Sequence, residues 1–268
     1  MDDPDLKLLF AVIILIVFGV IGWTYRDQLF GVAEQEPVPV AEPAQPVASD
    51  EPAGPQHPMP EMSGHMVTGE LVDLPPLDDS DAYFLLEIAA TFGPAIESLL
   101  VRDAVIDRLV TTIDNLPRSE LPEKVRPVGQ LKEPFATDTK EGEVVLGITS
   151  YARYDALIAR LYYADLDAVY DTYRRFYPLF QKSYERLGYP EGYFNDRLVE
   201  VIDHLIAAPL PEAPIVLVRP KVLYEFADPE LEALSSGQKL MLRMGPDNSA
   251  TLKRLLTRFR DRLTASQG

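Results

Sequence analysis

The chain has 268 residues, a formal net charge of −17 at pH 7 and no cysteine. Without cysteine it cannot use disulfides, thiolate metal ligands or a cysteine nucleophile. The acidic balance argues against nucleic acid as a partner, because contacts to phosphate groups need a basic surface. Residues 1–78 hold two basic and 13 acidic residues, so most of the negative charge belongs to this N-terminal segment.

An apolar segment at residues 8–25 follows a short N-terminus of residues 1–7. Its 18 positions include no charged residue, and at 1.5 Å per residue they span about 27 Å, close to the roughly 30 Å core of a bilayer. Trp23 and Tyr25 stand at its end, where a membrane interface favours aromatic rings. We therefore predict a transmembrane helix that binds the lipid bilayer. The alternative is a secretory signal cleaved after Gly31-Val32-Ala33.

The orientation of this helix depends on very few charges. Lys7 precedes it, Arg26 follows it, and the next basic residue is Arg102. A stretch without lysine and arginine meets no positive-charge resistance to export. We expect the N-terminus in the cytoplasm and the remainder in the periplasm, which makes the chain a single-pass protein of the bacterial inner membrane.

Residues 26–76 are predicted to form a disordered tether. Residues 34–78 contain ten of the 24 prolines, together with many acidic and small residues and no apolar periodicity. Proline removes backbone donors and favours extended conformations. The pairs Pro37 with Pro39 and Pro58 with Pro60 lack the Pro-x-x-Pro spacing that many proline-binding modules recognise.

Residues 77–268 are predicted to fold into a mainly α-helical domain with at most a short β-hairpin or edge strands. A capping cluster at residues 78–81 precedes the first helix, and apolar residues at helical spacing mark the others. Pro178 lies inside the clearest amphipathic pattern and predicts a kink or a break there. Helices are expected from the end of the capping cluster to about residue 92, at 96–116, from 150, and at 165–187, 194–207, 229–244 and 247–265. A strand is expected at 144–148, and an edge or split strand within 214–226.

Tyrosines follow the helix predicted at residues 165–187 and the loop after it. The aromatic stripe of that helix indicates either a buried face or a polar-edged groove for a glycan or peptide. In the loop, the glycines and Pro190 fit a turn, and Asn195 or Asp196 can cap the next helix. Two tyrosines of the loop have no such structural explanation. The sequence therefore predicts a binding surface made of Tyr177, Tyr184, Tyr189, Tyr193, Asn195 and Asp196.

The next helix carries Asp196, Glu200, Asp203 and His204 on the side opposite its apolar residues. These side chains fit either a solvated face, on which Arg197 pairs with Glu200, or general-base chemistry. A metal site would need further histidines or carboxylates from a second helix. No Gly-rich phosphate loop, GxSxG or HExxH motif is present, so no metal, cofactor or catalytic residue is predicted.

The last predicted helix is basic on one side and apolar on the other. We expect its basic side either to be solvated or to contact anionic lipid headgroups or an acidic partner. Its basic residues are Lys253, Arg254, Arg258, Arg260 and Arg262.

Two stretches of the chain are distinctive. One is Leu187-Gly-Tyr-Pro-Glu-Gly-Tyr-Phe-Asn-Asp-Arg197, and the other, residues 226–245, begins Phe-Ala-Asp-Pro-Glu-Leu-Glu-Ala-Leu and ends Gly-Gln-Lys-Leu-Met-Leu-Arg-Met-Gly. On these motifs, residues 75–265 resemble a widespread, uncharacterised proteobacterial family catalogued as domain of unknown function 3014. The N-terminal anchor and proline-rich tether belong to the same layout. The resemblance implies a membrane-anchored envelope protein and supplies no activity, substrate or catalytic residue.

These features favour a membrane-tethered, periplasmic interaction or scaffold module whose partner is another envelope protein or a cell-wall component. The alternative is a periplasmic enzyme, such as a cell-wall hydrolase, that uses carboxylates such as Asp196 and Glu200. An enzyme needs carboxylates that face each other across a cleft, whereas an interaction module needs only a surface patch.

Overall fold

The computed structural model describes residues 54–59, 65–67, 70–92, 100–127, 135–163, 165–211, 214–221 and 223–265. The N-terminus at residues 1–7, the transmembrane helix predicted at 8–25 and most of the tether predicted at 26–76 lie outside these residues. Within the described ranges, no helix combines the length and the apolar character needed to cross a membrane.

The described part is mainly helical and contains short hairpins, in agreement with the predicted fold class. Antiparallel pairs join β1 (His65–Val67) to β2 (Glu70–Val72), β3 (Thr137–Lys140) to β4 (Glu143–Leu146), and β5 (Leu217–Val218) to β6 (Glu225–Phe226). Short 3₁₀ turns are η3 (Leu77–Asp79) and η4 (Glu123–Val125). The α-helices are α2 (Asp81–Phe92), α4 (Val105–Asn115), α5 (Ile148–Ala152), α6 (Asp155–Tyr162), α7 (Leu166–Arg186), α8 (Phe194–Ile206), α9 (Pro229–Glu232), α10 (Ser236–Arg243) and α11 (Pro246–Thr264).

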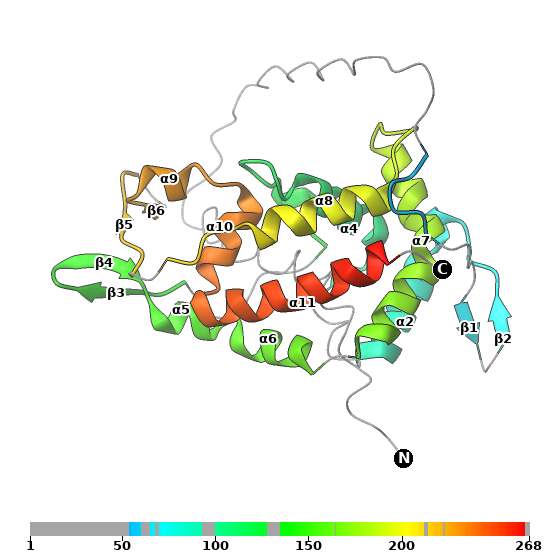
Figure 1. Cartoon of the computed structure of the whole chain (residues 1–268), viewed down its shortest axis with the longest axis horizontal. Coiled ribbons are helices and arrows are strands. Elements are labelled where there is room, and N and C mark those ends of the chain that lie inside the picture. Colours follow the sequence, from blue (N-terminus) through cyan, green and yellow to red (C-terminus); the bar gives the residue numbers. More distant parts are fainter. Residues whose placement is uncertain are drawn as a thin grey trace.

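The helices enclose an apolar core in which α11 has a central place. This helix packs against α6, α7, α8 and α10, and Figure 1 shows it running between α8 and α6. On the other side of the core, α2 and α4 pack against α7. Most of its buried residues are aliphatic, whereas its largest fully buried side chains are aromatic. Some of these rings stack, as Tyr173 does on Phe180 with ring centroids 5.6 Å apart. Burial of this apolar surface stabilises the fold.

Helix α7 confirms the clearest helix prediction. Asp165 is its N-cap and accepts hydrogen bonds from two backbone N–H groups of the first turn. Gly188 follows its end with a φ of +105°, which favours glycine. The helix continues through Pro178, so the predicted break does not occur. Buried Phe176 and Phe180 lie on either side of the proline, and their packing offsets the roughly 3 kcal/mol that an interior proline costs.

Within the described residues, the helix predicted at 96–116 begins only at the start of α4, because its first turn is capped from elsewhere in the chain. Residues 96–99 of that prediction lie outside the described residues. Ala104 has a left-handed φ of 51° and precedes the first helical residue, Val105. The two carboxylate oxygens of Asp81 accept hydrogen bonds from the N–H groups of Ala104 and Val105, at 2.7 and 2.8 Å. An aspartate from the start of α2 therefore supplies the cap that the local sequence lacks.

The helix predicted at residues 229–244 is two helices, α9 and α10. Asp228 caps α9, and Ser235 caps α10 through a hydrogen bond from the N–H of Gln238 at 3.1 Å. A serine in extended conformation at this point stops the first helix and starts the second. Gly245 and Pro246 then separate α10 from α11, as predicted.

The β3–β4 hairpin covers a smaller apolar cluster at one end of the molecule, opposite to the β1–β2 hairpin in Figure 1. Glu141 and Gly142 form its turn at positive φ, and it contains the predicted strand, here residues 143–146. Val145 also bridges to Val216, which links this hairpin to β5 and β6. The buried residues of the cluster are Leu146, Ile215, Leu217, Phe226 and Leu242.

Several basic side chains of α11 make contacts within the domain. Arg260 donates to both carboxylate oxygens of Asp203 on α8, at 2.5 and 3.1 Å. Arg262 pairs with Asp167 on α7, and Lys253 donates to the backbone carbonyl of Ala208. This side of the helix therefore holds α7 and α8 in place, in addition to any contact with a lipid or partner.

Candidate functional site

The loop between α7 and α8 is fixed by Gln181. Its Oε1 accepts a hydrogen bond from the N–H of Phe194 at 2.8 Å, and its Nε2 donates to the carbonyl of Gly192 at 2.8 Å. Tyr193 is the N-cap residue of α8 and makes no side-chain capping bond. The predicted cap by Asn195 or Asp196 is therefore wrong. A glutamine from α7 satisfies this end of α8 and leaves those two side chains for other contacts.

Asn195 and Asp196 hold a separate segment of the chain, residues 54–59, drawn in blue in Figure 1 beside the loop between α7 and α8. Asp196 accepts hydrogen bonds from the backbone N–H of Gln56 to Oδ2 at 2.9 Å and from that of His57 to Oδ1 at 2.8 Å. The Nδ2 of Asn195 donates to the carbonyl of His57 at 2.8 Å. We call Asn195 and Asp196 the α8 shelf and residues 54–59 the docked segment. Part of the predicted tether thus packs on the domain.

Tyr173 positions the α8 shelf from the buried side of α8. The hydroxyl of Tyr173 donates to Oδ1 of Asn195 at 3.1 Å, and both side chains are fully buried. Burial raises the pKa of Tyr173 well above its ordinary value, so its hydroxyl remains a donor. Because Oδ1 of Asn195 is occupied on the inner side, its Nδ2 points outward as a donor. This arrangement sets the α8 shelf to bind a carbonyl and two adjacent N–H groups of a peptide backbone.

A cavity of about 530 Å³ lies beside the docked segment. Its walls combine tyrosine rings with charged side chains from α8 and α11, so it offers both stacking surfaces and ion pairs to a partner. It is lined by Gln56, His57, Tyr184, Tyr193, Asp196, Arg197, Val199, Glu200, Asp203 and Arg260.

The four tyrosines of the predicted surface lie in this region with different exposures. Tyr184 is buried and stacks on Tyr189, with ring centroids 4.6 Å apart. Tyr177 donates to Oε1 of Gln181 at 3.1 Å. Burial raises the pKa of Tyr177 and of Tyr184 to about 12, so both hydroxyls stay protonated. Tyr193 is the half-exposed ring on the cavity wall.

A buried ion pair that the sequence analysis missed supports this region. The carboxylate of Asp114, only 3% exposed, accepts a hydrogen bond from Nε of Arg197 at 2.9 Å. Arg197 also donates to the carbonyl of Asp114 and to Glu200, both at 2.8 Å. The sequence contains one signal of this ion pair. Asp114 stands four residues after Val110 on the apolar side of α4, where an acidic side chain needs a buried partner.

The polar side of α8 is less solvated than the solvated face that was one of the two predicted alternatives. The expected pair of Arg197 with Glu200 is present. Asp196 instead binds the docked segment, and Asp203 binds Arg260. His204 contacts Ser235 through Nε2 at 2.8 Å. The contacts come from elements distant in sequence, which a helical wheel cannot show. In the described part of the chain, no group of three or more histidine and acidic side chains is placed to hold a metal ion.

The contact of His204 predicts a pH dependence of stability. Burial lowers the pKa of His204, and the charge of Arg197 adds to this effect. The unfolded chain then binds a proton more readily than the folded one, near an ordinary pKa of about 6.5. The contribution of neutral His204 is present above that pH and is lost as the pH falls toward the lower folded-state pKa.

We expect the free energy of unfolding to fall less between pH 7.5 and 5.5 in His204→Gln than in the unaltered chain, as measured by urea unfolding. Glutamine keeps a polar partner for Ser235 and cannot take up the proton. His57→Gln, which removes an imidazole without this contact, is the control. An unchanged pH dependence in His204→Gln would contradict the assignment.

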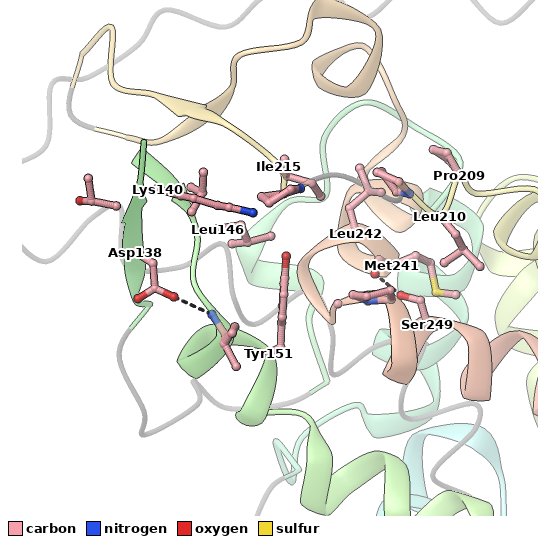
Figure 2. Close-up of a pocket in the computed structure, with 17 residues that line it drawn as sticks. Asp138, Lys140, Leu146, Tyr151, Pro209, Leu210, Ile215, Met241, Leu242 and Ser249 are labelled. Carbon is pink, nitrogen blue, oxygen red and sulfur yellow. Dashed lines mark hydrogen bonds between the residues drawn. The ribbon is translucent and has the colours of Figure 1, made fainter. Parts of the chain in front are cut away.

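A second cavity, of about 550 Å³, lies under the β3–β4 hairpin and was not predicted. Figure 2 shows Tyr151, Leu146 and Leu242 around it, with Lys140 reaching over it from the hairpin. Asp138 fixes the hairpin to α5 by accepting a hydrogen bond from the N–H of Ile148 at 3.0 Å. Three segments that lie apart in the sequence form this cavity, so no local sequence pattern predicts it. Its walls are mostly apolar, which is typical of pockets for apolar groups.

The described part of the chain is a mainly helical domain whose α8 shelf binds the backbone of another segment of the same chain. The chain matches a family described as a protein of unknown function (DUF3014) over residues 105–260, and it belongs to that family. The match includes α4, α7, α8, α10 and most of α11, and therefore the α8 shelf and its support. No curated protein and no solved structure matches the chain.

Proposed function

We propose that the chain is a single-pass protein of the bacterial inner membrane whose helical domain acts in the periplasm as an interaction module. We propose further that the α8 shelf and the cavity beside it are the surface on which an envelope partner binds. The observation that carries this proposal is the docked segment: a stretch of chain bound to Asn195 and Asp196 through its backbone by hydrogen bonds at 2.8 and 2.9 Å.

The contacts of the carboxylates support this proposal over a cell-wall hydrolase. Asp196 and Glu200 stand one turn apart on the same helix, so they line one wall and do not face each other across a substrate. Asp196 is engaged by two N–H groups, and Glu200 pairs with Arg197. A general acid or base needs a carboxyl group that is free to exchange a proton with substrate.

The absence of cysteine permits a direct test in cells. Glu200 is 68% exposed in its side chain and lines the cavity, so Glu200→Cys gives the chain a single thiol beside the α8 shelf. A thiol reagent that cannot cross membranes should label this variant from the periplasmic side. A photoactivated crosslinker attached to the same thiol should capture a partner in intact membranes.

Glu143→Cys, on the exposed end of the β3–β4 hairpin, is the matched control. It should be labelled equally well from the periplasmic side and should not give the same crosslinked product. Labelling of both variants only after the membrane is permeabilised would reverse the orientation. Identical products from the two positions would remove the α8 shelf as the binding surface.

A further inference from the structure

The docked segment has a Pro-x-x-Pro pattern, from Pro55 to Pro58. Proline has no backbone N–H, and its ring fixes φ at about −65°. The two residues between the prolines, Gln56 and His57, are those whose N–H groups bind Asp196. The backbone bends at these two residues, which turns both N–H groups to the same side. The segment thus presents two adjacent donors to the two oxygens of one carboxylate.

Recognition of the docked segment uses its main chain. The hydrogen bonds to the α8 shelf involve two N–H groups and one carbonyl of the segment. Pro55, His57 and Met59 are half-buried and face the domain, whereas the residues between them are exposed. Met59 packs against the main apolar core. Another peptide with the same proline spacing and an apolar residue after the second proline can make the same contacts.

The α8 shelf has its own supports, which do not depend on the docked segment. Tyr173 orients Asn195 from the interior, and Gln181 holds the start of α8. Arg197, next to Asp196, is bound to Asp114. If the docked segment leaves, the donor of Asn195 and the carboxylate of Asp196 face solvent in the same geometry. The shelf is therefore a preformed receptor, which lowers the cost of binding a new peptide.

We infer that the α8 shelf is a receptor for a Pro-x-x-Pro segment of a partner protein that bends at the two residues between its prolines, and that the docked segment is a built-in competitor for it. This inference rests on the proposed function, in which the shelf is the binding surface. A segment on the same chain has an effective concentration of about millimolar order. It lowers the apparent affinity for an outside peptide in proportion to the fraction of shelf that it occupies.

The test uses the full chain in detergent micelles and a fluorescent peptide with the sequence of the docked segment, Gly-Pro-Gln-His-Pro-Met. The opened variant has residues 54–59 replaced by alternating glycine and serine. It also carries Pro46→Ala, because Pro43-Ala44-Gln45-Pro46 repeats the pattern. We expect the opened variant to bind the peptide at least about tenfold more tightly than the unaltered chain, as measured by fluorescence anisotropy.

Three comparisons make the result specific to the main chain and to the α8 shelf. Adding Asp196→Asn to the opened variant should weaken binding by about tenfold or more, since Asp196 accepts two of the bonds. Adding Asp261→Asn, on the exposed side of α11, should leave binding unchanged. A peptide methylated on the N–H groups of its glutamine and histidine should not bind, whereas the Pro-Ala-Ala-Pro version should bind equally.

Failure of the opened variant to bind the peptide, or equal binding of the methylated peptide, would overturn the inference. If the opened variant does not fold, Gln56→Pro replaces it, because this change removes one donor of the docked segment and leaves the domain unaltered. The crosslinking experiment tests the proposed function independently of peptide binding. If crosslinking from Glu200→Cys is not specific, the proposed function is contradicted. If crosslinking is specific but the peptide does not bind, only the inference of a Pro-x-x-Pro receptor is overturned.

Discussion

Replacing Asp114 by asparagine is expected to lower the free energy of unfolding by about 3 kcal/mol. The substitution removes the buried one of the two carboxylates that pair with Arg197, whose side chain is 18% exposed; the other, Glu200, is exposed to solvent. Breaking a buried pair on one side costs more than the pair contributes, because the remaining charge stays away from water. Arg118 and the hydroxyl of Tyr189 also approach the same carboxylate, at 3.0 and 3.4 Å. Loss of Asp114 therefore affects the support of the α8 shelf and the loop before it.

Urea unfolding of Asp114→Asn is compared with that of Asp203→Asn. The comparison distinguishes the loss of the buried ion pair from the loss of an acidic residue in general. Asp203 pairs with Arg260, and both side chains are well exposed, at 47% and 36%, so its loss should cost less than about 1 kcal/mol. In the double variant Asp114→Asn with Arg197→Met, the cost should be smaller than the sum of the two single costs. Equal costs for the two aspartates would show that burial of the Asp114 pair has no special role.

The sequence was sufficient to predict most helices, because their signals are local. The apolar spacing and the capping Asp165 of α7, the glycine after its end, and the Gly245–Pro246 junction are each contained within a few residues. The errors have a common cause. Helix α4 begins at Val105, where Asp81 supplies the cap. Helix α8 begins at residue 194, as predicted, but the N–H of Phe194 is bound by Gln181 and not by the predicted cap from Asn195 or Asp196. Both contacts come from other elements of the fold, and no local pattern contains them.

The candidate site was predictable in part, for the same reason. Tyr184, Tyr193 and Asp196 line one cavity, as the predicted surface from the loop and α8 implied. The sequence analysis considered the spacing of Pro58 with Pro60 and overlooked that of Pro55 with Pro58. Even with that spacing noted, its acceptor could not have been identified, because Gln56 and Asp196 are 140 residues apart.

Replacing Gly245 by alanine is expected to lower the free energy of unfolding by about 3 kcal/mol, for two separable reasons. Gly245 has a φ of +83° and a ψ of 164°, a region essentially restricted to glycine that costs an L residue about 1–3 kcal/mol. A Cβ at this position would also lie 2.6 Å from Cγ of Tyr151, a ring that is held between α5 and the start of α11. Forcing such a contact into a packed site costs about 1–3 kcal/mol more. Both α10 and the cavity under the β3–β4 hairpin should be disturbed.

Gly142→Ala is the control for an alanine at positive φ without a collision, because the φ of Gly142 is +85° and a Cβ there would meet no atom within 4 Å. The collision with Tyr151 is measured by the difference between the cost of Gly245→Ala in the unaltered chain and its cost in a Tyr151→Ala background. In that background the collision partner is gone, so Gly245→Ala should keep only its backbone cost of about 1–3 kcal/mol. Urea unfolding of these four variants gives the comparison. A Gly245→Ala cost that is the same with and without the Tyr151 ring would show that backbone strain alone accounts for the glycine.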